Sequence, residues 1–542
     1  MLFPKFSRRT FFRALSGAAL GAFATKAGVL SVRDAEAASS DTGPSDVATS
    51  KARAIDVRRY ARALKNRLKA YRRARKKRLP TQRANRDVRT FGPAFGYTKV
   101  LPKDDIAEPS PAQFRVYQQE IKKGKFQSFE DNVASGAKGF KNPIGAHCTD
   151  LQGFDASQFS IPPAPAVESA EASAEIAELY WMALCRDVSF SDYETDSTVS
   201  SAISDLNSGY SDFRGAKVDG LVTPGTLFRS GAPGRLIGPY VSQLLLLDVA
   251  TGRLSFDQRQ QTTKPGSDWM TRSDFFNFRQ GGNRDGNEHV FDETKRYIRN
   301  GRDLAMVVWD DKTFSTYLHG FYILFNMGIS RDSGNPYTTA RVSTGFVTGD
   351  YPQIMSELAG VILPALKAAW WQKWNVHLRI RPEEFAGRIH YHKVGATDYS
   401  FLSPEILEST VLEQVFTYNG LIDASAYPGN GASYLLPMAY PEGCPNHPSY
   451  PSGHAVMAGA AATLLKAHFD ENEVIKSPMI PNADGTALEP YTGGETLTVG
   501  NEINKLASNI CEGRNWAGLH YRSDMEQGLR LGEKVAIELL RE

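Results

Sequence analysis

The chain has 542 residues, of which 41% are hydrophobic and 23% are charged, and its formal net charge is +3. These values lie near the averages of globular proteins, so they exclude a disordered chain and a protein embedded in a membrane over most of its length. A chain this long buries a large core and can form one large domain or two or three ordinary ones. Its function must therefore be inferred from local motifs.

The first 37 residues have the order of a twin-arginine export signal. Arg8 and Arg9 precede an apolar stretch of small residues at 14–24, and an A-x-A sequence follows at 35–37. The alternative is an amphipathic basic helix on the folded protein. The apolar stretch is shorter than the roughly 20 residues of a membrane span, and we see no longer uncharged stretch downstream. We therefore expect export to the periplasm or the cell exterior, with residues 1–37 removed and no membrane span.

Residues 38–165 are predicted to form a linker, a basic helix and an irregular arm. Residues 51–89 contain 17 Lys and Arg against two Asp, and Pro80 ends the helical part of this segment. The rest of the chain, 90–542, has 40 Lys and Arg against 54 Asp and Glu. Docking of the basic helix onto this acidic body or onto another subunit is favoured over nucleic-acid binding, and a solvated helix is the alternative. The Pro- and Gly-interrupted stretch 90–165 is expected to be peripheral.

Helical periodicity dominates residues 166–542, and strand-like alternation is scarce. We therefore predict a mainly α fold of packed bundles, with two four-helix-bundle-like halves in a single domain. The segments predicted to be helical are 168–186, 233–249, 291–309, 311–328, 352–378, 403–418, 454–469, 499–513 and 523–541.

The four cysteines are too few and too scattered for a disulfide scaffold or a thiolate metal site. Their spacing gives no pairing for an exported protein. They are Cys148, Cys185, Cys444 and Cys511.

The first cluster with chemical potential spans residues 370–382, at the end of the predicted helix 352–378. Pro382 biases Arg381 away from the helical conformation, so the helix should loosen there. Lys373 and Arg381 can then converge, although eight positions separate them. The alternative is an ordinary basic helix end that faces solvent.

The second cluster, residues 447–454, runs directly into an apolar helix. Ser452 can cap that helix while free N–H groups of the first turn form an anion site, and Gly453 lets a ligand approach the backbone. His454 stands at the same helix end, where it can act as an acid or a base. A plain capped helix would explain Ser452 and Gly453 but would leave His447 and His454 without a role.

The third cluster spans residues 513–524. Asp524 lies one helical turn beyond His520, so its carboxylate can accept the proton of one ring nitrogen and leave the other free as a nucleophile or a ligand. Arg514 offers a planar fork of donors that suits an oxyanion. The alternative is a surface helix with scattered polar residues.

Together the three clusters provide three fixed cations, backbone donors and an oriented imidazole. This is the set that a buried tetrahedral oxyanion such as vanadate or phosphate requires. Each cation at about 4 Å from the anion contributes about 4 kcal/mol before desolvation is subtracted. Without them, an acidic body would repel such a ligand.

The order Lys…Arg-Pro, Pro-Ser-Gly-His and Arg…His resembles the superfamily of type-2 phosphatidic-acid phosphatases and vanadium-dependent haloperoxidases. Seven residues lie between Lys373 and Arg381, whereas the phosphatases usually have six, and Gly513 replaces the Ser that they carry before the last Arg. Trp370 and His447 also look like those of the algal and cyanobacterial bromoperoxidases. Similar stretches at 227–243 extend the resemblance to roughly residues 200–542.

The resemblance implies a role for each matching residue, within a vanadate site at 370–524. His520 would bind vanadium through its ring, His454 would be the acid or base, and Lys373 would polarise hydrogen peroxide. Trp370 and His447 would line the halide side, where fungal chloroperoxidases keep the Trp and carry Phe at the position of His447. The residues that would hold the vanadate oxygens are Lys373, Arg381, Ser452, Gly453 and Arg514.

The resemblance implies oxidation of bromide and iodide, with chloride a weak substrate, to hypohalous acid that halogenates an organic acceptor. Vanadate would be the cofactor, with no haem, and a homo-oligomer with no nucleic-acid partner is expected. The alternative enzyme is an exported acid phosphatase in which His520 forms a phosphohistidine. A non-catalytic oxyanion-binding protein is the third reading, and it would not need His454.

Overall fold

The computed structural model describes residues 46–136, 139–149, 154–283, 289–312, 314–426 and 432–541. The predicted export signal, residues 1–37, lies outside these ranges, so it stays a prediction. The chain divides into two compact units, Met1–Lys77 and Arg78–Glu542. Each unit is described by itself below.

The described part of the first unit is one long helix, α4 (Asp46–Lys76), which confirms the predicted basic helix. Its last turn carries Arg73, Arg75 and Lys76. Apolar side chains along it are exposed, among them Leu64 at 42% and Leu68 at 44%. The predicted docking of this basic helix onto the acidic body or onto another subunit stays a prediction.

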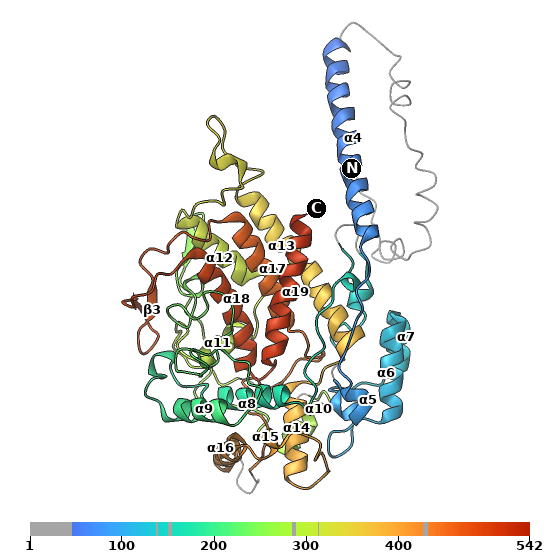
Figure 1. The fold of residues 1–542 in the computed structure, drawn as a ribbon, viewed down its shortest axis with the longest axis vertical. Coiled ribbons are helices and arrows are strands. Elements are labelled where there is room, and N and C mark those ends of the chain that lie inside the picture. The colour runs from blue at the N-terminus through green and yellow to red at the C-terminus, as the bar shows by residue number, and fades with distance from the viewer. Residues whose placement is uncertain are drawn as a thin grey trace, which may run out of the picture. The chain divides into compact units, whose positions relative to one another are not determined.

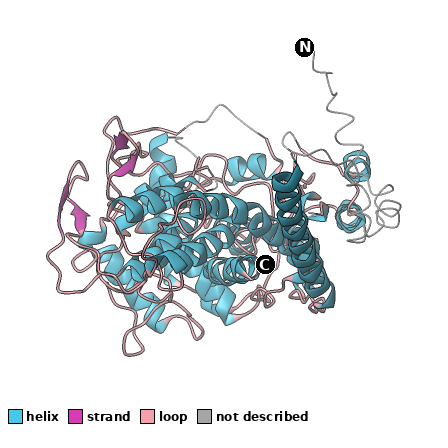
Figure 2. Cartoon of the chain, turned by 90° about the horizontal axis from the view of Figure 1, so that it is seen from above, coloured by secondary structure: helices cyan, strands magenta, loops and turns pink. Residues whose placement is uncertain are grey.

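The regular secondary structure of the second unit is helical apart from two short antiparallel hairpins, and long loops connect the helices (Figure 2), which confirms the mainly α class. Its helices are α5 (Asp87–Phe91), α6 (Pro111–Lys123), α7 (Phe126–Asn132), α8 (Ala170–Leu184), α9 (Ser197–Ser208), α10 (Ser273–Gln280), α11 (Gly301–Val307), α12 (Ser315–Asn326), α13 (Tyr351–Trp371), the π-helix η7 (Gln372–His377), α14 (Pro382–Lys393), α15 (Pro404–Leu407), α16 (Thr410–Ala426), α17 (Gly453–His468), α18 (Val499–Trp516) and α19 (Arg522–Leu540). The strands are β1 (Val249–Thr251), β2 (Leu254–Phe256), β3 (Met479–Pro481) and β4 (Leu488–Pro490).

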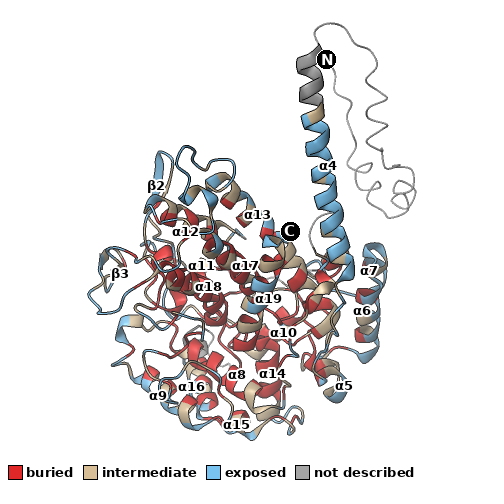
Figure 3. Cartoon of the chain, turned by 45° about the horizontal axis from the view of Figure 1, so that its top comes forward, coloured by how far each residue is buried: buried red, intermediate tan, exposed pale blue. Residues whose placement is uncertain are grey.

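One group of helices, α13, α17, α18 and α19, packs around α17. Its buried side chains concentrate along α17 and α18 (Figure 3). α17 and α19 cross closely because glycines stand at the crossing. A Cβ at Gly459 would lie 2.1 Å from the carbonyl oxygen of Leu529, and one at Gly532 would lie 2.0 Å from that of Val456. Any larger side chain at these two positions would push the helices apart.

A second group, α8, α9, α15 and α16, packs around α8 and lies below the first group in the view of Figure 1. α8 is buried along nearly its whole length and also contacts α18. It therefore reaches from the second group to the helices that carry the site.

Three expectations about helices differ from the structure. Residues 233–249 form turns and a short 3-10 segment, because Gly234 and Gly238 have positive φ and Pro239 follows. Their apolar side chains are buried without a regular helix around them. Of the predicted helix 291–309 only α11 is helical. α14 was missed because its buried face is rich in Glu, Arg and His, which hides the apolar periodicity.

The stretch 90–165 is not peripheral, contrary to expectation. α6 and the residues before it build a buried aromatic cluster in which Tyr97 and Tyr117 pack edge-on against Trp374 of η7, with ring centroids 5.7 and 6.3 Å apart. Short helices between Pro and Gly residues gave too little periodicity for the sequence to reveal this packing.

One helix of the described chain, Tyr351–His377, has the length and composition of a membrane span, with a mean hydropathy of 1.2. It packs against α17 and α19. None of the four cysteines, all of which are described, is in a disulfide; Cys148 is exposed and the other three are buried.

Candidate active site

Lys373 enters the core just after α13, where the helix changes its winding. The chain continues as the π-helix η7, and Leu378 then takes a left-handed conformation with φ 47°. Lys373 is fully buried. Its Nζ donates to the carbonyl oxygens of Pro448 and Ser449, both at 2.7 Å. Since an ammonium has three N–H groups, one remains for a ligand.

Arg381 is the N-cap of α14 and has an extended backbone before Pro382. Its guanidinium lies between two imidazoles: NH1 is 3.0 Å from Nε2 of His520, and NH2 is 3.0 Å from Nδ1 of His447. NH1 also donates to the carbonyl oxygen of Leu519 at 2.7 Å. The loosened helix end thus places Arg381 beside His520, as the sequence predicted.

Trp370 and His447 form one wall of this site. Their ring centroids are 4.8 Å apart, and the Trp370 Nε1 donates to the carbonyl oxygen of Lys141 at 3.1 Å. A Cβ at Gly453 would lie 3.3 Å from Cζ3 of Trp370. The indole therefore packs against the start of α17, where a side chain at position 453 would make a tight contact with it.

Ser452 caps α17 by accepting a hydrogen bond from the N–H of Ala455 at 3.4 Å. Its own N–H donates to the backbone oxygen of Asp524 at 3.0 Å, which ties the start of α17 to α19. The N–H groups of Gly453 and His454 belong to the first turn and have no acceptor within the helix. They are the donors that the predicted anion site would use.

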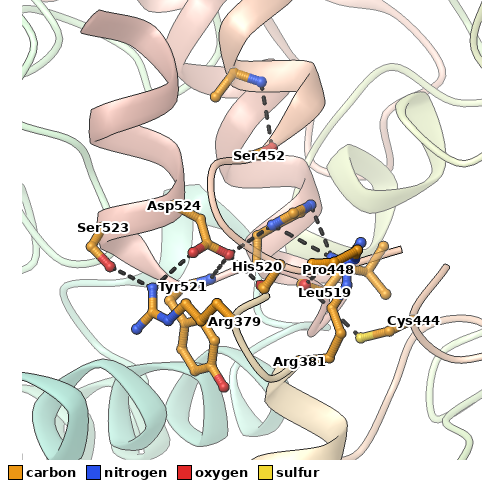
Figure 4. Close-up of polar contacts among 12 residues, drawn as sticks. Arg379, Arg381, Cys444, Pro448, Ser452, Leu519, His520, Tyr521, Ser523 and Asp524 are labelled. Atoms are coloured by element: carbon orange, nitrogen blue, oxygen red, sulfur yellow. Dashed lines mark hydrogen bonds and ion pairs between the residues drawn. The ribbon is translucent and has the colours of Figure 1, made fainter. Parts of the chain in front are cut away.

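His520 and Asp524 are paired at the start of α19 (Figure 4): Nδ1 of His520 lies 2.8 Å from Oδ2 of Asp524. A carboxylate acceptor places the ring proton on Nδ1 and leaves the lone pair on Nε2. Both side chains are buried, with exposed fractions of 1% and 0%.

His454 has a carboxylate partner as well, which the sequence did not reveal. Its Nε2 lies 3.0 Å from Oδ1 of Asp311, which comes from the segment between α11 and α12. The two side chains are 20% and 14% exposed. This pair therefore lies nearer to solvent than the pair of His520.

Arg514, near the end of α18, has an unused donor. Its NH1 donates to the carbonyl oxygen of Val308 at 2.6 Å, but its buried Nε has no hydrogen-bond partner among the described residues. A buried polar atom without a partner is costly and marks a place where a ligand would bind.

The site carries more positive than negative charge. Burial and the charges of Arg381 and Arg514 hold the pKa of Lys373 well below its usual range. Burial, and then the charges of Arg381, Lys373 and Arg514, likewise hold the pKa of His520 well below its usual range. Burial, and then the charges of Arg381 and Lys373, also hold the pKa of His447 well below its usual range. The imidazoles are therefore neutral at neutral pH, and an anionic ligand would relieve the repulsion among Lys373, Arg381 and Arg514.

Both the sequence and the fold of this chain are similar to those of known proteins. Residues 410–541 match the family model described as the VCPO second helical-bundle domain. The chain is 34% identical over 463 residues to a vanadium-dependent bromoperoxidase of Ascophyllum nodosum, which covers 82% of each chain. It is also 34% identical over 532 residues to a vanadium-dependent bromoperoxidase of Corallina pilulifera, covering 84% of this chain and 89% of that one.

The chain belongs to the vanadium-dependent bromoperoxidase family. Its fold is similar to that of a solved family member, a homohexameric vanadate-dependent bromoperoxidase (AnII) of Ascophyllum nodosum, with a TM-score of 0.83 and 29% identity. That likeness covers 89% of this chain and 84% of the other. The predicted family is thereby confirmed, and the phosphatase alternative finds no support among these relatives.

Vanadate, the cofactor in the name of this family, fits the residues present. The orphaned Nε of Arg514 and the remaining N–H of Lys373 are donors that a tetrahedral oxyanion needs, and Nε2 of His520, which accepts from Arg381 NH1 in this structure, is the ring nitrogen that can serve as its ligand. The residues that the sequence singled out lie within electrostatic reach of one another: Lys373, Arg381, His454, Arg514, His520 and Asp524.

The sequence missed residues that act on this site from distant segments. Asp311 is 143 positions from His454. Arg379 stood inside the first cluster but was not singled out, although it contacts Asp524. Glu175 of α8, in turn a partner of Arg379, gave no signal at all. A local motif cannot reveal contacts that only the tertiary fold creates.

Proposed function

We propose that this chain oxidises bromide and iodide with hydrogen peroxide to hypohalous acid, which halogenates an organic acceptor. The observation that carries the proposal is the buried, uncompensated cluster of Lys373, Arg381 and Arg514 around the neutral imidazole of His520. The names of the relatives support vanadate as the cofactor that this cluster holds.

Bound vanadate supplies a Lewis-acid centre that activates hydrogen peroxide. Nε2 of His520 would bind the vanadium, since Nδ1 is committed to Asp524. The three cations would balance the negative charge of the oxygens in a site of low dielectric, where such pairs are strong. The N–H of Gly453 and the hydroxyl of Ser452 would add neutral donors at the helix end.

His454 would move protons in this site. Because Nε2 faces Asp311, Nδ1 is left as the proton acceptor. Burial, and next the charge of Arg514, lower the pKa of His454, so the ring is neutral and ready to accept a proton at neutral pH. Its 20% exposure leaves a route by which that proton reaches solvent.

Lys373 would orient the peroxide. Two of its N–H groups are held by backbone carbonyls, which fixes the direction of the third. A fixed cationic donor draws electron density from a peroxide oxygen and makes it a better target for halide.

His447 and Trp370 would favour bromide and iodide over chloride. Arg381 holds the His447 ring at 3.0 Å, so an imidazole that can bind water or an oxyanion lines the halide side. Chloride is harder to oxidise and more strongly hydrated than bromide, and a polar, hydrated wall gives it little help.

The test is an assay of protein stripped of metal, with bromide and hydrogen peroxide, before and after addition of vanadate. Activity should appear only with vanadate. A phosphatase with the same residues would instead hydrolyse a phosphate monoester and be inhibited by vanadate, and that result would overturn the proposal.

We also propose that the chain is exported by the twin-arginine route. The support is the sequence order around Arg8 and Arg9. Changing both residues to Lys should leave the protein in the cytoplasm of the producing cell, as fractionation would measure. Normal export of that variant would refute the signal.

A homo-oligomer is the proposed assembly, and the homohexameric structure of AnII supports it. The basic helix α4, with its exposed Leu64 and Leu68, is a candidate subunit contact. Light scattering of the chain with and without residues 1–77 would test both points. A monomer in both cases would refute the assembly.

A further inference from the structure

A buried row of charged side chains runs from α8 to the His520 ring. Glu175 of α8 accepts a hydrogen bond from Arg379 NH2 at 2.8 Å, and Arg379 NH1 donates to Oδ1 of Asp524 at 2.7 Å. Asp524 then accepts from Nδ1 of His520 at 2.8 Å (Figure 4). Each of the four side chains is buried.

Asp524 has both carboxylate oxygens engaged. Oδ2 faces the His520 ring, accepts a short hydrogen bond from the Ser449 hydroxyl and lies 3.3 Å from the N–H of Tyr521. Oδ1 is held by Arg379 alone among the contacts described. Arg379 therefore fixes the rotation of the carboxylate, and through it the plane of the His520 ring.

Arg379 is itself held on two sides. Its Cζ stands 4.0 Å from the centre of the Tyr521 ring, and its NH1 also donates to the Ser523 hydroxyl at 2.7 Å. Glu175 accepts from both Arg379 and the N–H of Ser523, the latter at 2.5 Å. Glu175 thus anchors the guanidinium and the residue next to Asp524 at once.

We propose that Glu175 and Arg379 are positioning residues that set the orientation of His520 for vanadium binding, an inference that rests on the proposed role of His520. A ligand bond tolerates little angular error, and partners behind a metal-binding imidazole typically change metal affinity about 10- to 100-fold when they are removed. A planar guanidinium that bridges two carboxylates suits this task better than a flexible ammonium.

The chain offers a matched control one helical turn away. Glu178, also on α8, pairs with Arg522 of α19, at 2.9 Å to Nε. Glu175 and Glu178 are both buried and both tie α8 to the start of α19, but Glu178 does not contact Asp524 or Arg379 in the described contacts. Changing Glu178 reports the general cost of losing a buried ion pair between these elements.

The test compares E175Q with E178Q, two substitutions of equal shape. Vanadate affinity of the metal-free protein is measured by calorimetry or equilibrium dialysis, and thermal unfolding is measured in parallel. We expect E175Q to weaken vanadate binding about 10-fold or more and E178Q to leave it within about twofold, with similar losses of thermal stability. Equal vanadate affinity for the two variants would overturn the proposal.

A second variant, R379K, keeps the charge but loses the bridging fork. It should also weaken vanadate binding, and affinity equal to that of the unmodified protein would overturn the role of Arg379. A third variant, H520A, distinguishes the ligand role of His520 from the positioning role of Glu175 and Arg379. If H520A binds vanadate normally, the proposed function of His520 fails; if it does not, while E175Q and R379K bind normally, only the positioning role fails.

Discussion

Two histidines of the site are each paired with an aspartate, and the two pairs have different surroundings. His520 and Asp524 are four positions apart at the start of one helix and are 1% and 0% exposed. His454 and Asp311 are 143 positions apart, come from different elements and are 20% and 14% exposed. The first carboxylate is held further by Arg379 and Ser449.

The difference shows how surroundings divide one type of pair between two tasks. A saturated, buried carboxylate fixes a ring in place, which suits a ligand. A carboxylate nearer to solvent beside a more exposed ring suits the uptake and release of protons. For Asp311, burial raises the pKa, but the pairing with His454 and the charge of Arg514 together bring the pKa below its usual range, so the partner stays ionised.

The largest effect is expected from H520A. It removes the proposed bond to vanadium, so bromide oxidation should fall to background and vanadate affinity should fall with it. Steady-state bromination and equilibrium dialysis measure the two. His468 pairs with Glu357 at 2.7 Å, away from the cations of the site, and H468A serves as the control that should keep both properties. Full activity of H520A would contradict the ligand assignment.

H454A should separate proton transfer from binding. Removing a general acid or base costs about 10²- to 10⁴-fold in turnover, whereas vanadate affinity should change less than about 10-fold. The same two measurements apply. If H454A lost vanadate affinity as completely as H520A, the two histidine–aspartate pairs would not have different tasks.

D311N should cost about 10-fold in turnover and change the pH dependence in one direction. Burial lowers the pKa of His454, and Asp311 opposes this by charge and hydrogen bond. Without that carboxylate the pKa of His454 falls further, so protonation of the base sets in at a lower pH. The acid limb of the kcat/KM profile for bromide should therefore move to lower pH. A shift to higher pH would contradict the argument.

H447F should have the smallest effect, a several-fold change in halide preference. The unmodified enzyme is expected to use bromide and iodide well and chloride weakly. A phenyl ring cannot bind Arg381 or ordered water, so the variant should use chloride better and bromide less well. Rates with the three halides at equal peroxide and saturating vanadate provide the comparison. Chloride turnover equal to that of bromide in the unmodified enzyme would refute the halide argument.

The sequence revealed the elements whose signals are local. α13, α17, α18 and α19 carry long apolar periodicities, and the predicted ranges match them within a few residues. The residues of the site come from short motifs at the ends of these helices, so the sequence alone suggested a role for each of them without the tertiary structure. The segment 233–249 misled because an apolar run looks the same in a helix and in a buried irregular chain.

Other parts depend on contacts that no local pattern records. α14 buries Arg388 and Glu383, through hydrogen bonds and ion pairs, alongside apolar residues such as Phe385, so its apolar periodicity is hidden. Asp311 lies in a short acidic pair that looks like a surface turn. Glu175 is one of several acidic residues in an ordinary amphipathic pattern, and only packing places it behind Arg379.

The π-helical winding of η7 has a consequence for insertions and deletions. An i→i+5 turn holds one residue more than an α-turn, and the gap between Lys373 and Arg381 is one residue longer here than the spacing usual in the related phosphatases. The wider π-helical turn of η7 thus accommodates the additional residue. Deleting one residue from 374–376 would let the segment rewind as an α-helix and turn Lys373 by about 100° relative to Arg381. In this chain, the length of one helical turn would then decide which way the ammonium of Lys373 points.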